Sequence, residues 1–375
     1  MLNGTPTPTS TRRAGRLLRL GVITVVLITA FAAPSTAAPR TPAGPNIAGG
    51  QAGRSSQWIA RPPLRHARGG LGVARVRRQI FAIGGFEVVD KVATYFDVVE
   101  ARRVKGSGRW RDLAPMPTAR ANLATAEVGG LVYAIGGLDD VNDFDVVETL
   151  DPRSGRWTTS VPLPQPRVRP GAAGLGGLLY VAGGEVKLAP DTFEITNSVL
   201  VYDPKEHSWR SAAPMPTART GLRLVASGRY LYAIGGAAIG QPGQFGPSLT
   251  TVERYDPKSN RWATMNPMVE SRVLPCAVQT KVGNRHVLVV VGGAEFSVAG
   301  TAVQARPTTE VFDPHTGRWT LLDVLLPFGR GSHDCATEAD GTVLAIGGIT
   351  SVGGTPVFLA NVDALSLKPR DLRSH

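Results

Sequence analysis

The sequence predicts an all-β fold built from six equivalent units of four antiparallel strands. Paired glycines recur roughly every 50 residues, and a fixed period of this size indicates a stack of equivalent supersecondary units. The tryptophans recur with the same period, and each interval repeats one order of strand and turn signals. The glycine pairs are Gly84-Gly85, Gly136-Gly137, Gly183-Gly184, Gly235-Gly236, Gly292-Gly293 and Gly347-Gly348. The tryptophans are Trp58, Trp110, Trp157, Trp209, Trp262 and Trp319.

Each unit contains the same elements in the same order. In the unit that starts at Trp110, a Pro-Met-Pro segment leads to Arg120 and an alternating strand at 123–128. After a glycine turn, a second strand at 131–135 ends in Gly136-Gly137. A loop of variable length, a third strand and an Asp-Pro turn then precede the next tryptophan, and proline favours such a reversal because it presets φ. This order predicts four strands per unit.

The pattern resembles the Kelch repeat, which has paired glycines after an aromatic residue, a tryptophan after an Asp-Pro turn, and a Pro-Met-Pro segment that leads to an arginine. The resemblance covers residues 55–368 and implies a six-bladed β-propeller in which each unit forms one four-stranded blade. Two units depart from it, because Val289 and Leu344 stand at the aromatic position. The first unit also lacks the Asp-Pro turn before Trp110.

The two ends of the repeat region predict how the ring closes. The last glycine pair is followed by a third strand, at 358–367, and by no tryptophan. Trp58 has no earlier strand to pair with, and its distance to the next glycine pair equals that of Trp110. We therefore expect an N-terminal strand around Trp58 to complete the sixth blade, which joins the termini and removes an exposed sheet edge.

Residues 1–37 have the features of a secretory signal peptide. Arginines precede an apolar segment at 21–33, and Ser35-Thr36-Ala37 supplies small residues for cleavage. The apolar segment is shorter than the roughly 20 residues that span a bilayer. We expect a secreted, periplasmic or cell-surface protein, exported by the general secretory or the twin-arginine route. The expected organisation is a signal peptide at 1–37, a flexible linker at 38–54, the propeller at 55–368 and a C-terminal tail at 369–375.

The formal net charge of +12 is unevenly distributed. The first 80 residues contain arginines and no acidic residue, and acidic and basic residues balance in the rest of the chain. The basic stretch from Arg75 to Arg78 could attract polyanions or a charged cell surface, and the alternative is a solvated turn between two strands. No aromatic-basic pattern points to a nucleic acid, so we expect no nucleic-acid partner.

The antiparallel strand order predicts which face of the disc binds a ligand. The loops between second and third strands vary in length, and they share a face with the connections between blades. The turns on the opposite face are short. Variable loops on a rigid scaffold are the usual place for binding. These loops are 86–93, 138–144, 185–197, 237–249, 294–307 and 349–355.

Six arginines open the innermost strands on this face, beside the central channel. Grouped guanidinium groups suit carboxylates, sugar acids or acidic peptide side chains. Each arginine could instead brace a neighbouring blade by binding backbone carbonyls, and both roles stay open because a position fixed by the fold does not imply function. The six are Arg68, Arg120, Arg167, Arg219, Arg272 and Arg330.

The sixth unit adds His333 and Asp334 at the start of its inner strand. Side chains alternate along a strand, so one of the two faces the channel. His333 is a candidate for proton transfer near neutral pH, and the alternative is a surface histidine with local hydrogen bonds. Glu185 could supply an acid to the same face or be a solvated loop residue. Cys276 and Cys335 occupy similar positions in consecutive units, and export permits a disulfide, but the sequence leaves their pairing open.

Strong catalytic signatures are absent from the sequence. It has no zinc-type Cys/His spacing, no glycine-rich phosphate loop before a helix and no Gly-x-Ser-x-Gly motif. We therefore expect no catalytic residue, no metal and no cofactor. The favoured function is a monomeric, exported binding module that recognises a protein or glycan with acidic groups around the central channel.

An enzyme is the main alternative. Exported N-acetylneuraminate epimerases are six-bladed Kelch-like propellers, so the resemblance also admits a cofactor-independent sugar epimerase or mutarotase. A carboxylate such as Glu185 or Asp334 beside Arg219 or Arg272 would then act as acid or base. A structural protein bound to the cell wall is a third reading, favoured by the basic segment alone.

Overall fold

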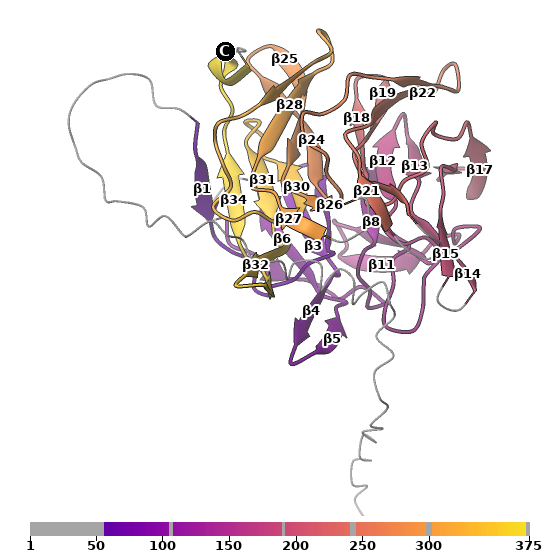
Figure 1. Cartoon of the computed structure of the whole chain (residues 1–375). Helices are drawn as coiled ribbons and strands as arrows, with labels where there is room; N and C mark the ends of the chain where they lie inside the picture. Colours follow the sequence, from indigo (N-terminus) through magenta and orange to yellow (C-terminus); the bar gives the residue numbers. More distant parts are fainter. Residues whose placement is uncertain (1–55, 105–107, 190–191, 241–244, 298–301, 373–375) are drawn as a thin grey trace, which may run out of the picture.

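The computed structural model describes residues 56–104, 108–189, 192–240, 245–297 and 302–372. These residues form six four-stranded antiparallel sheets, which are the blades of a β-propeller (Figure 1). The predicted all-β, six-bladed architecture is therefore confirmed. The predicted signal peptide and linker lie outside the described residues. No helix among the described residues is long and apolar enough to cross a lipid bilayer.

The first three blades follow one another along the chain. Blade one contains β2 (Gly72–Val76), β3 (Gln79–Ile83), β6 (Val99–Arg103) and β7 (Arg111–Asp112). Blade two contains β8 (Ala124–Val128), β9 (Leu131–Ile135), β10 (Val147–Asp151) and β11 (Arg156–Thr159). Blade three contains β12 (Gly171–Leu175), β13 (Leu178–Ala182), β16 (Val199–Asp203) and β17 (Ser208–Ala212).

The last three blades complete the ring. Blade four contains β18 (Arg223–Ser227), β19 (Tyr230–Ile234), β22 (Val252–Asp256) and β23 (Arg261–Thr264). Blade five contains β24 (Cys276–Val282), β25 (Arg285–Val291), β28 (Thr309–Asp313) and β29 (Arg318–Leu321). Blade six contains β30 (Asp334–Thr337), β31 (Val343–Ile346), β34 (Val362–Leu365) and β1 (Trp58–Arg61). A short 3-10 helix, Pro369–Leu372, follows.

The N-terminal strand closes the ring as predicted. In Figure 1, β1 (indigo) lies beside β34 (yellow), although the two strands stand at opposite ends of the chain. They pair antiparallel from Trp58 opposite Leu365 to Arg61 opposite Val362. The six innermost strands are neighbours around the whole circle, including β2 against β30. The fold therefore depends on both ends of the chain.

The glycine pairs let neighbouring blades approach each other. Gly84 has a φ of 61°, a left-handed conformation that side chains other than glycine rarely adopt. A Cβ atom placed on Gly84 would lie 2.6 Å from the carbonyl oxygen of Arg120, which belongs to the next blade. A side chain at Gly84 would therefore obstruct the close approach of blade two to blade one.

The tryptophans connect consecutive blades. The indole nitrogen of Trp209 donates a 3.1 Å hydrogen bond to the carbonyl oxygen of Val161, in the connection that leaves the preceding blade. Trp157, Trp262 and Trp319 make the equivalent bond to Ala114, Ala213 and Asn266. These four indoles therefore pack at a blade boundary and hold the connection to the preceding blade with their N–H groups.

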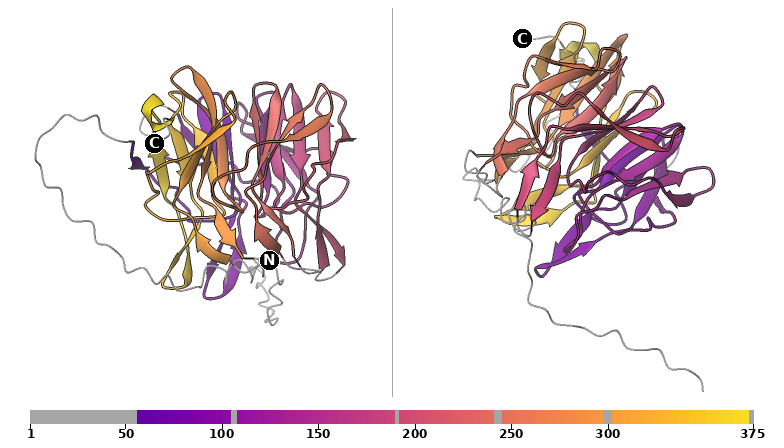
Figure 2. Two further views of the ribbon diagram at one scale, coloured as in Figure 1. Left: turned by 45° about the horizontal axis from the view of Figure 1, so that its top comes forward. Right: turned by 90° about the vertical axis from the view of Figure 1, so that its right-hand side faces the viewer.

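Five of the loops between second and third strands form small β-hairpins of their own, which we did not predict from the sequence. They project together from one face of the disc (Figure 2, left, lower edge). The hairpins pair β4 (Phe86–Val89) with β5 (Val92–Tyr95), β14 (Glu185–Ala189) with β15 (Thr192–Ile195), β20 (Ala237–Ile239) with β21 (Phe245–Ser248), β26 (Ala294–Phe296) with β27 (Ala302–Ala305), and β32 (Ile349–Val352) with β33 (Thr355–Phe358).

Candidate functional site

The hairpins and the blade connections share one face, which we call the loop face. Isolated β-bridges join them, for example between Gly69 and Phe86 and between Gly331 and Ile349. The six arginines that open the inner strands stand at the ends of these connections. The antiparallel topology therefore places the arginines and the long loops on the same side of the disc, as expected.

These six ring arginines are buried rather than open to solvent. Five of them are fully buried, and Arg167 is 3% exposed. Five pair with a carboxylate on the third strand of the same blade, as Arg272 does with Glu310 at 2.9 Å. The other four pairs are Arg68 with Glu100, Arg120 with Glu148, Arg219 with Glu253, and Arg330 with Asp363.

The geometry of the ring arginines favours bracing of the fold. Arg120 also donates to the carbonyl oxygen of Ala134 on β9, and Arg272 donates to that of Gly292. A ligand carboxylate would have to displace a buried internal carboxylate to reach such a guanidinium, and an unpaired buried charge is costly. Recognition of a ligand by the ring arginines stays a prediction.

Blade three lacks the carboxylate that the other blades supply. Leu200 stands on β16 where Glu148 stands on β10. Arg167 instead donates to Ser198 Oγ at 2.6 Å and to the carbonyl oxygen of Gly183 at 2.9 Å. Burial lowers the pKa of Arg167 to about 10, against a weaker opposing effect of Glu194. Arg167 is thus the ring member that forms no ion pair among the described residues.

A closed ring of backbone hydrogen bonds narrows the channel at the loop face. Six residues, each two positions after a ring arginine, donate N–H to the carbonyl oxygen of the equivalent residue in the adjacent blade, at 2.8–3.2 Å. All six have φ between 52° and 63°. In this conformation the N–H group of each residue points to one adjacent blade and its carbonyl group points to the other. Only glycine adopts this conformation without cost. The six are Gly70, Asn122, Arg169, Gly221, Leu274 and Ser332.

Behind this peptide ring lies an axial cavity of about 300 Å³ that is lined by all six inner strands. Arg223 extends along its wall, where it donates to the carbonyl oxygens of Pro275 and His333 and lies 3.4 Å from Asp334. Asp334 also accepts a 2.8 Å hydrogen bond from the backbone amide of Val73. Burial raises the pKa of Asp334, although Arg223 opposes the shift. Asp334 therefore faces the cavity, and its arginine partner is Arg223 rather than Arg219 or Arg272.

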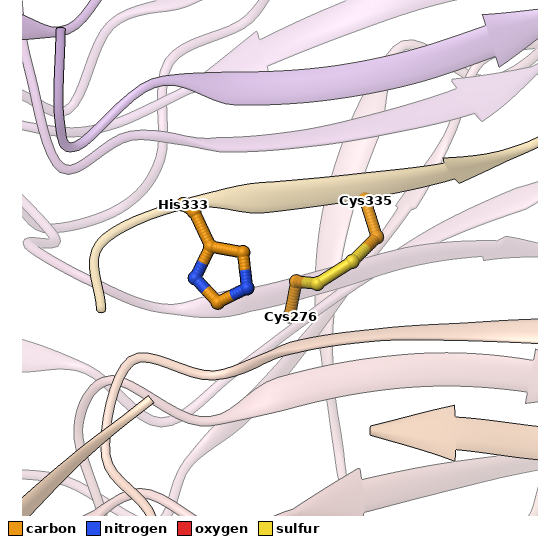
Figure 3. A group of neighbouring side chains, drawn as sticks. All are labelled: Cys276, His333 and Cys335. Carbon is orange, nitrogen blue, oxygen red and sulfur yellow. A yellow bond between two sulfur atoms is a disulfide. The ribbon is translucent and has the colours of Figure 1, made fainter. Parts of the chain in front are cut away.

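His333 is not part of the cavity lining. Its side chain lies beside Cys276 and Cys335, between blades five and six (Figure 3). It is fully buried, so it is not a surface histidine, and the alternation expected for His333 and Asp334 is observed. The imidazole faces the backbone of Val291, but neither ring nitrogen makes a well-formed hydrogen bond within the described part of the chain. An unsatisfied buried polar group costs about 1–3 kcal/mol. Burial lowers the pKa of His333 well below its usual value, and Arg330 adds to the shift.

His333→Leu is expected to make the protein less sensitive to acid. The unfolded histidine takes up a proton near pH 6.5, whereas the folded one stays neutral to a lower pH. The unfolded state therefore binds more protons below pH 6.5, and wild-type stability falls as the pH decreases. Between about pH 7.5 and 5, the melting temperature of the wild type should decrease more than that of the variant as the pH is lowered. Equal decreases would contradict the neutral, buried imidazole.

Glu185 is part of the protein interior on the loop face. It is 2% exposed and accepts two hydrogen bonds from Arg169, both at 2.8 Å, and one from Thr220 at 2.6 Å. The Arg169 guanidinium also lies 5.5 Å above the ring of Phe245. Glu185 is therefore neither a solvated loop residue nor a free acid beside the channel, and its role toward a ligand stays a prediction.

The hairpins bury an aromatic cluster over the peptide ring. Phe86 packs edge-on against Phe358 with ring centroids 5.2 Å apart, and Phe245 contacts both Phe193 and Phe296. Leu274 of the peptide ring belongs to the same cluster. The bases of the hairpins are thus fixed by packing against one another.

The ends of the hairpins carry exposed apolar side chains. Apart from Ile59, every exposed large apolar residue of the described chain lies on a hairpin, a loop, a blade connection or a strand end of the loop face. The turn residues of three hairpins, β14–β15, β20–β21 and β26–β27, lie outside the described residues. We define the hairpin tips as Val89 (58% exposed), Val92 (56%), Leu188 (65%), Ile239 (47%) and Val352 (62%), together with Val141 (72%) in the loop of blade two, which forms no hairpin.

The opposite face, which we call the turn face, carries a basic pocket. It has a volume of about 510 Å³ between blades one and two and contains no acidic residue in its lining. Four exposed arginines line it, and none of them forms an ion pair among the described residues. The basic stretch noted in the sequence supplies two of them. The four arginines are Arg77, Arg78, Arg103 and Arg153.

Comparison with known proteins supports the family resemblance. Residues 119–164, 166–216 and 218–269 each match the family model of the Kelch motif. Kelch-like protein 23 of Homo sapiens is 27% identical over 285 residues, which cover 74% of this chain and 46% of that protein. Kelch-like protein 34 of Homo sapiens is 29% identical over 163 residues, or 42% of this chain and 24% of that protein. The chain thus spans less than half the length of these relatives.

A solved structure shows the same fold. The structure of YjhT matches with a TM-score of 0.65 at 17% identity, and the match covers 80% of this chain and 95% of that chain. Blades two to four carry the residues that match the Kelch motif, and the glycine pairs and tryptophans extend the same pattern around the ring. Together these matches show Kelch motifs in blades two to four and support the resemblance of the chain to Kelch-repeat proteins.

Proposed function

We propose that this chain is an exported Kelch-repeat binding module that holds a protein partner on its loop face through the hairpin tips. Kelch propellers bind proteins, and the exposed apolar side chains of the loop face carry the proposal. Apolar groups that gather on one face of a soluble protein mark interaction sites. Export rests on the signal features of residues 1–37.

The rigidity of the hairpins supports this role. Their bases are packed into one aromatic cluster, so the tips lose little conformational freedom when a partner binds. Preorganised contacts of this kind increase affinity because less entropy is lost on association. The proposed occupant is therefore a folded protein with a complementary apolar surface, bound by a single propeller.

Acidic groups of a ligand fit the turn face better than the loop face. Five ring arginines already bind internal carboxylates, whereas the lining of the turn-face pocket contains no acidic residue. Guanidinium groups bind carboxylates and other oxyanions in a bidentate manner. If the module also takes a glycan or peptide with acidic groups, we place that ligand in the turn-face pocket.

Replacement of apolar residues at the hairpin tips by aspartate is expected to weaken partner binding without unfolding the protein. A display library of folded protein domains selected on the wild type supplies the binders. A variant with Val92→Asp, Val141→Asp and Leu188→Asp should bind them at least tenfold more weakly, because buried interface anchors each contribute about 2 kcal/mol or more. The matched control is Ile59→Asp, which changes an exposed apolar residue away from the loop face.

Surface plasmon resonance on both variants measures the effect. Retention of wild-type affinity by the tip variant, or an equal loss in Ile59→Asp, would contradict the proposed face. Far-ultraviolet circular dichroism confirms that the folds are the same.

A sugar mutarotase remains the second candidate because Asp334 lies in a cavity of suitable size. The raised pKa of Asp334 suits a general acid, and Arg223 provides a positive charge beside it. The cavity has a volume of about 300 Å³. A general acid needs a pKa near the working pH and a substrate within hydrogen-bond reach. The test is the rate of sialic-acid mutarotation, followed by NMR, with the wild type and with Asp334→Asn. No acceleration by micromolar wild-type protein would remove this candidate.

A further inference from the structure

Three residues that can bind metal ions meet between blades five and six. Cys276 opens β24, Cys335 is the second residue of β30, and His333 precedes that strand (Figure 3). The two cysteines form a disulfide, with their Cα atoms 5.4 Å apart. One ligand atom from each of the three residues lies within 4.8 Å of the other two. All three residues are buried.

Packing alone does not explain why a histidine occupies this position. The other blades have an apolar residue there, in order Leu71, Leu123, Pro170, Leu222 and Pro275. The backbone leaves room for the imidazole, since a Cβ on Gly292 would lie 2.7 Å from Cε1 of His333. Both ring nitrogens nevertheless lack a well-formed hydrogen bond. A buried polar group without a partner in a native protein often indicates a redox role or a missing ion.

We propose that Cys276, Cys335 and His333 form a redox-controlled binding site for one Zn²⁺ ion. In the oxidised protein the disulfide occupies both sulfur atoms. A dithiol or phosphine reductant supplies two electrons, the S–S bond breaks, and each sulfur takes up one proton. Zn²⁺ then replaces these two protons and accepts a lone pair from the neutral imidazole. Reoxidation by a disulfide forms the S–S bond again and releases the ion.

The chemistry of the three ligands suits Zn²⁺. Zn²⁺ binds thiolate sulfur at about 2.3 Å and imidazole nitrogen at about 2.0 Å, with four ligands in a tetrahedron. Modest side-chain rotations therefore bring the three observed atoms onto one ion. Two thiolates and a neutral imidazole give a complex with no net charge, so burial carries little desolvation cost. Thiolate and imidazole together select Zn²⁺ over Mg²⁺ or Ca²⁺.

The site and the axial cavity lie on different sides of β30. Asp334 points into the cavity, and side chains alternate along a strand, so Cys335 points toward Cys276 of blade five, as His333 does. An ion therefore reaches the two sulfur atoms through the interface between blades five and six. Three protein ligands leave one position of a tetrahedral Zn²⁺ open, and a solvent molecule would supply the fourth ligand.

Metal titration of the reduced protein tests the proposal. The full chain is kept in a phosphine reductant, and two free thiols per chain are confirmed before Zn²⁺ is added in competition with a chromophoric chelator. We expect one tightly bound Zn²⁺ per reduced chain and none per oxidised chain. Co²⁺ in place of Zn²⁺ should give a thiolate charge-transfer band in the near ultraviolet.

The matched variant is His333→Leu, which installs the residue that three other blades carry. This variant should fold, keep both thiols and bind Zn²⁺ at least tenfold more weakly. His286→Leu, which changes an exposed histidine, should bind as wild type does. The proposal is overturned if reduced wild type binds no Zn²⁺, or if His333→Leu binds it as tightly as wild type does.

Discussion

Deletion of residues 55–62 is expected to lower the melting temperature by at least about 10 °C, which corresponds to a loss of several kcal/mol for a domain of this size. This deletion removes β1, so β34 loses all of its hydrogen-bonded neighbours on one side. Trp58 also leaves a core cluster that includes Val343 and Leu365. The open edge of β34 would in addition favour association between molecules.

Thermal melting followed by circular dichroism measures this loss. A deletion of the same length in the predicted linker, residues 45–52, is the control and should leave the melting temperature unchanged. If deletion of 55–62 had no larger effect than the control, the ring would not depend on its N-terminal strand.

Arg120→Met is expected to lower the free energy of unfolding by about 3–5 kcal/mol, because removal of one partner leaves the buried charge of the other uncompensated. Glu148 is 1% exposed, and its hydrogen bonds come from Arg120 and Thr118. Arg167→Met changes the same position of the repeat in blade three, where no carboxylate would be left behind. Arg167→Met should therefore lower the free energy of unfolding much less than Arg120→Met does.

A double variant separates the charge effect from packing. Replacement of Glu148 by Leu, the residue that blade three has at this place, should recover most of the stability lost in Arg120→Met. Urea denaturation of the single and double variants gives the free energies. Equal losses in Arg120→Met and Arg167→Met, or no recovery in the double variant, would show that the ring arginines do not act as internal braces.

The fold could be predicted because its signals are local and repeated. Each glycine pair ends a strand, each Asp-Pro turn reverses the chain, and each tryptophan starts the next unit, so six copies reinforce one prediction. Trp58 also predicted closure, since it was the one tryptophan without a preceding strand. The hairpins in the loops were not predicted, although the alternation in Phe86–Val89 is a strand signal.

The state of the ring arginines depends on contacts between residues that are distant in sequence. Arg68 and Glu100 are 32 residues apart, and Arg330 and Asp363 are 33 apart. Alignment of the third strands would have revealed the acidic residue in blades one, two, four, five and six and Leu200 in blade three. The peptide ring could not be predicted in this way, because Leu274 and Arg169 are not residues that favour a left-handed φ.

Comparison of the repeats also predicts that His333 is buried. It occupies a place that holds leucine or proline in the other blades, which predicts an interior position between blades. Its contact with Cys276 depends on the distance between neighbouring blades, and the sequence alone does not provide that distance.

Two variants of blade two test most directly whether ligands bind at the hairpin tips rather than at the ring arginines. Arg120→Met with Glu148→Leu removes a ring arginine together with its charge partner, and Val141→Asp changes the tip of the same blade. The affinity of one selected partner is measured for both. We predict wild-type affinity for the double variant and a loss of at least tenfold for Val141→Asp. The reverse result, with binding lost in the double variant and kept in Val141→Asp, would contradict the proposed function.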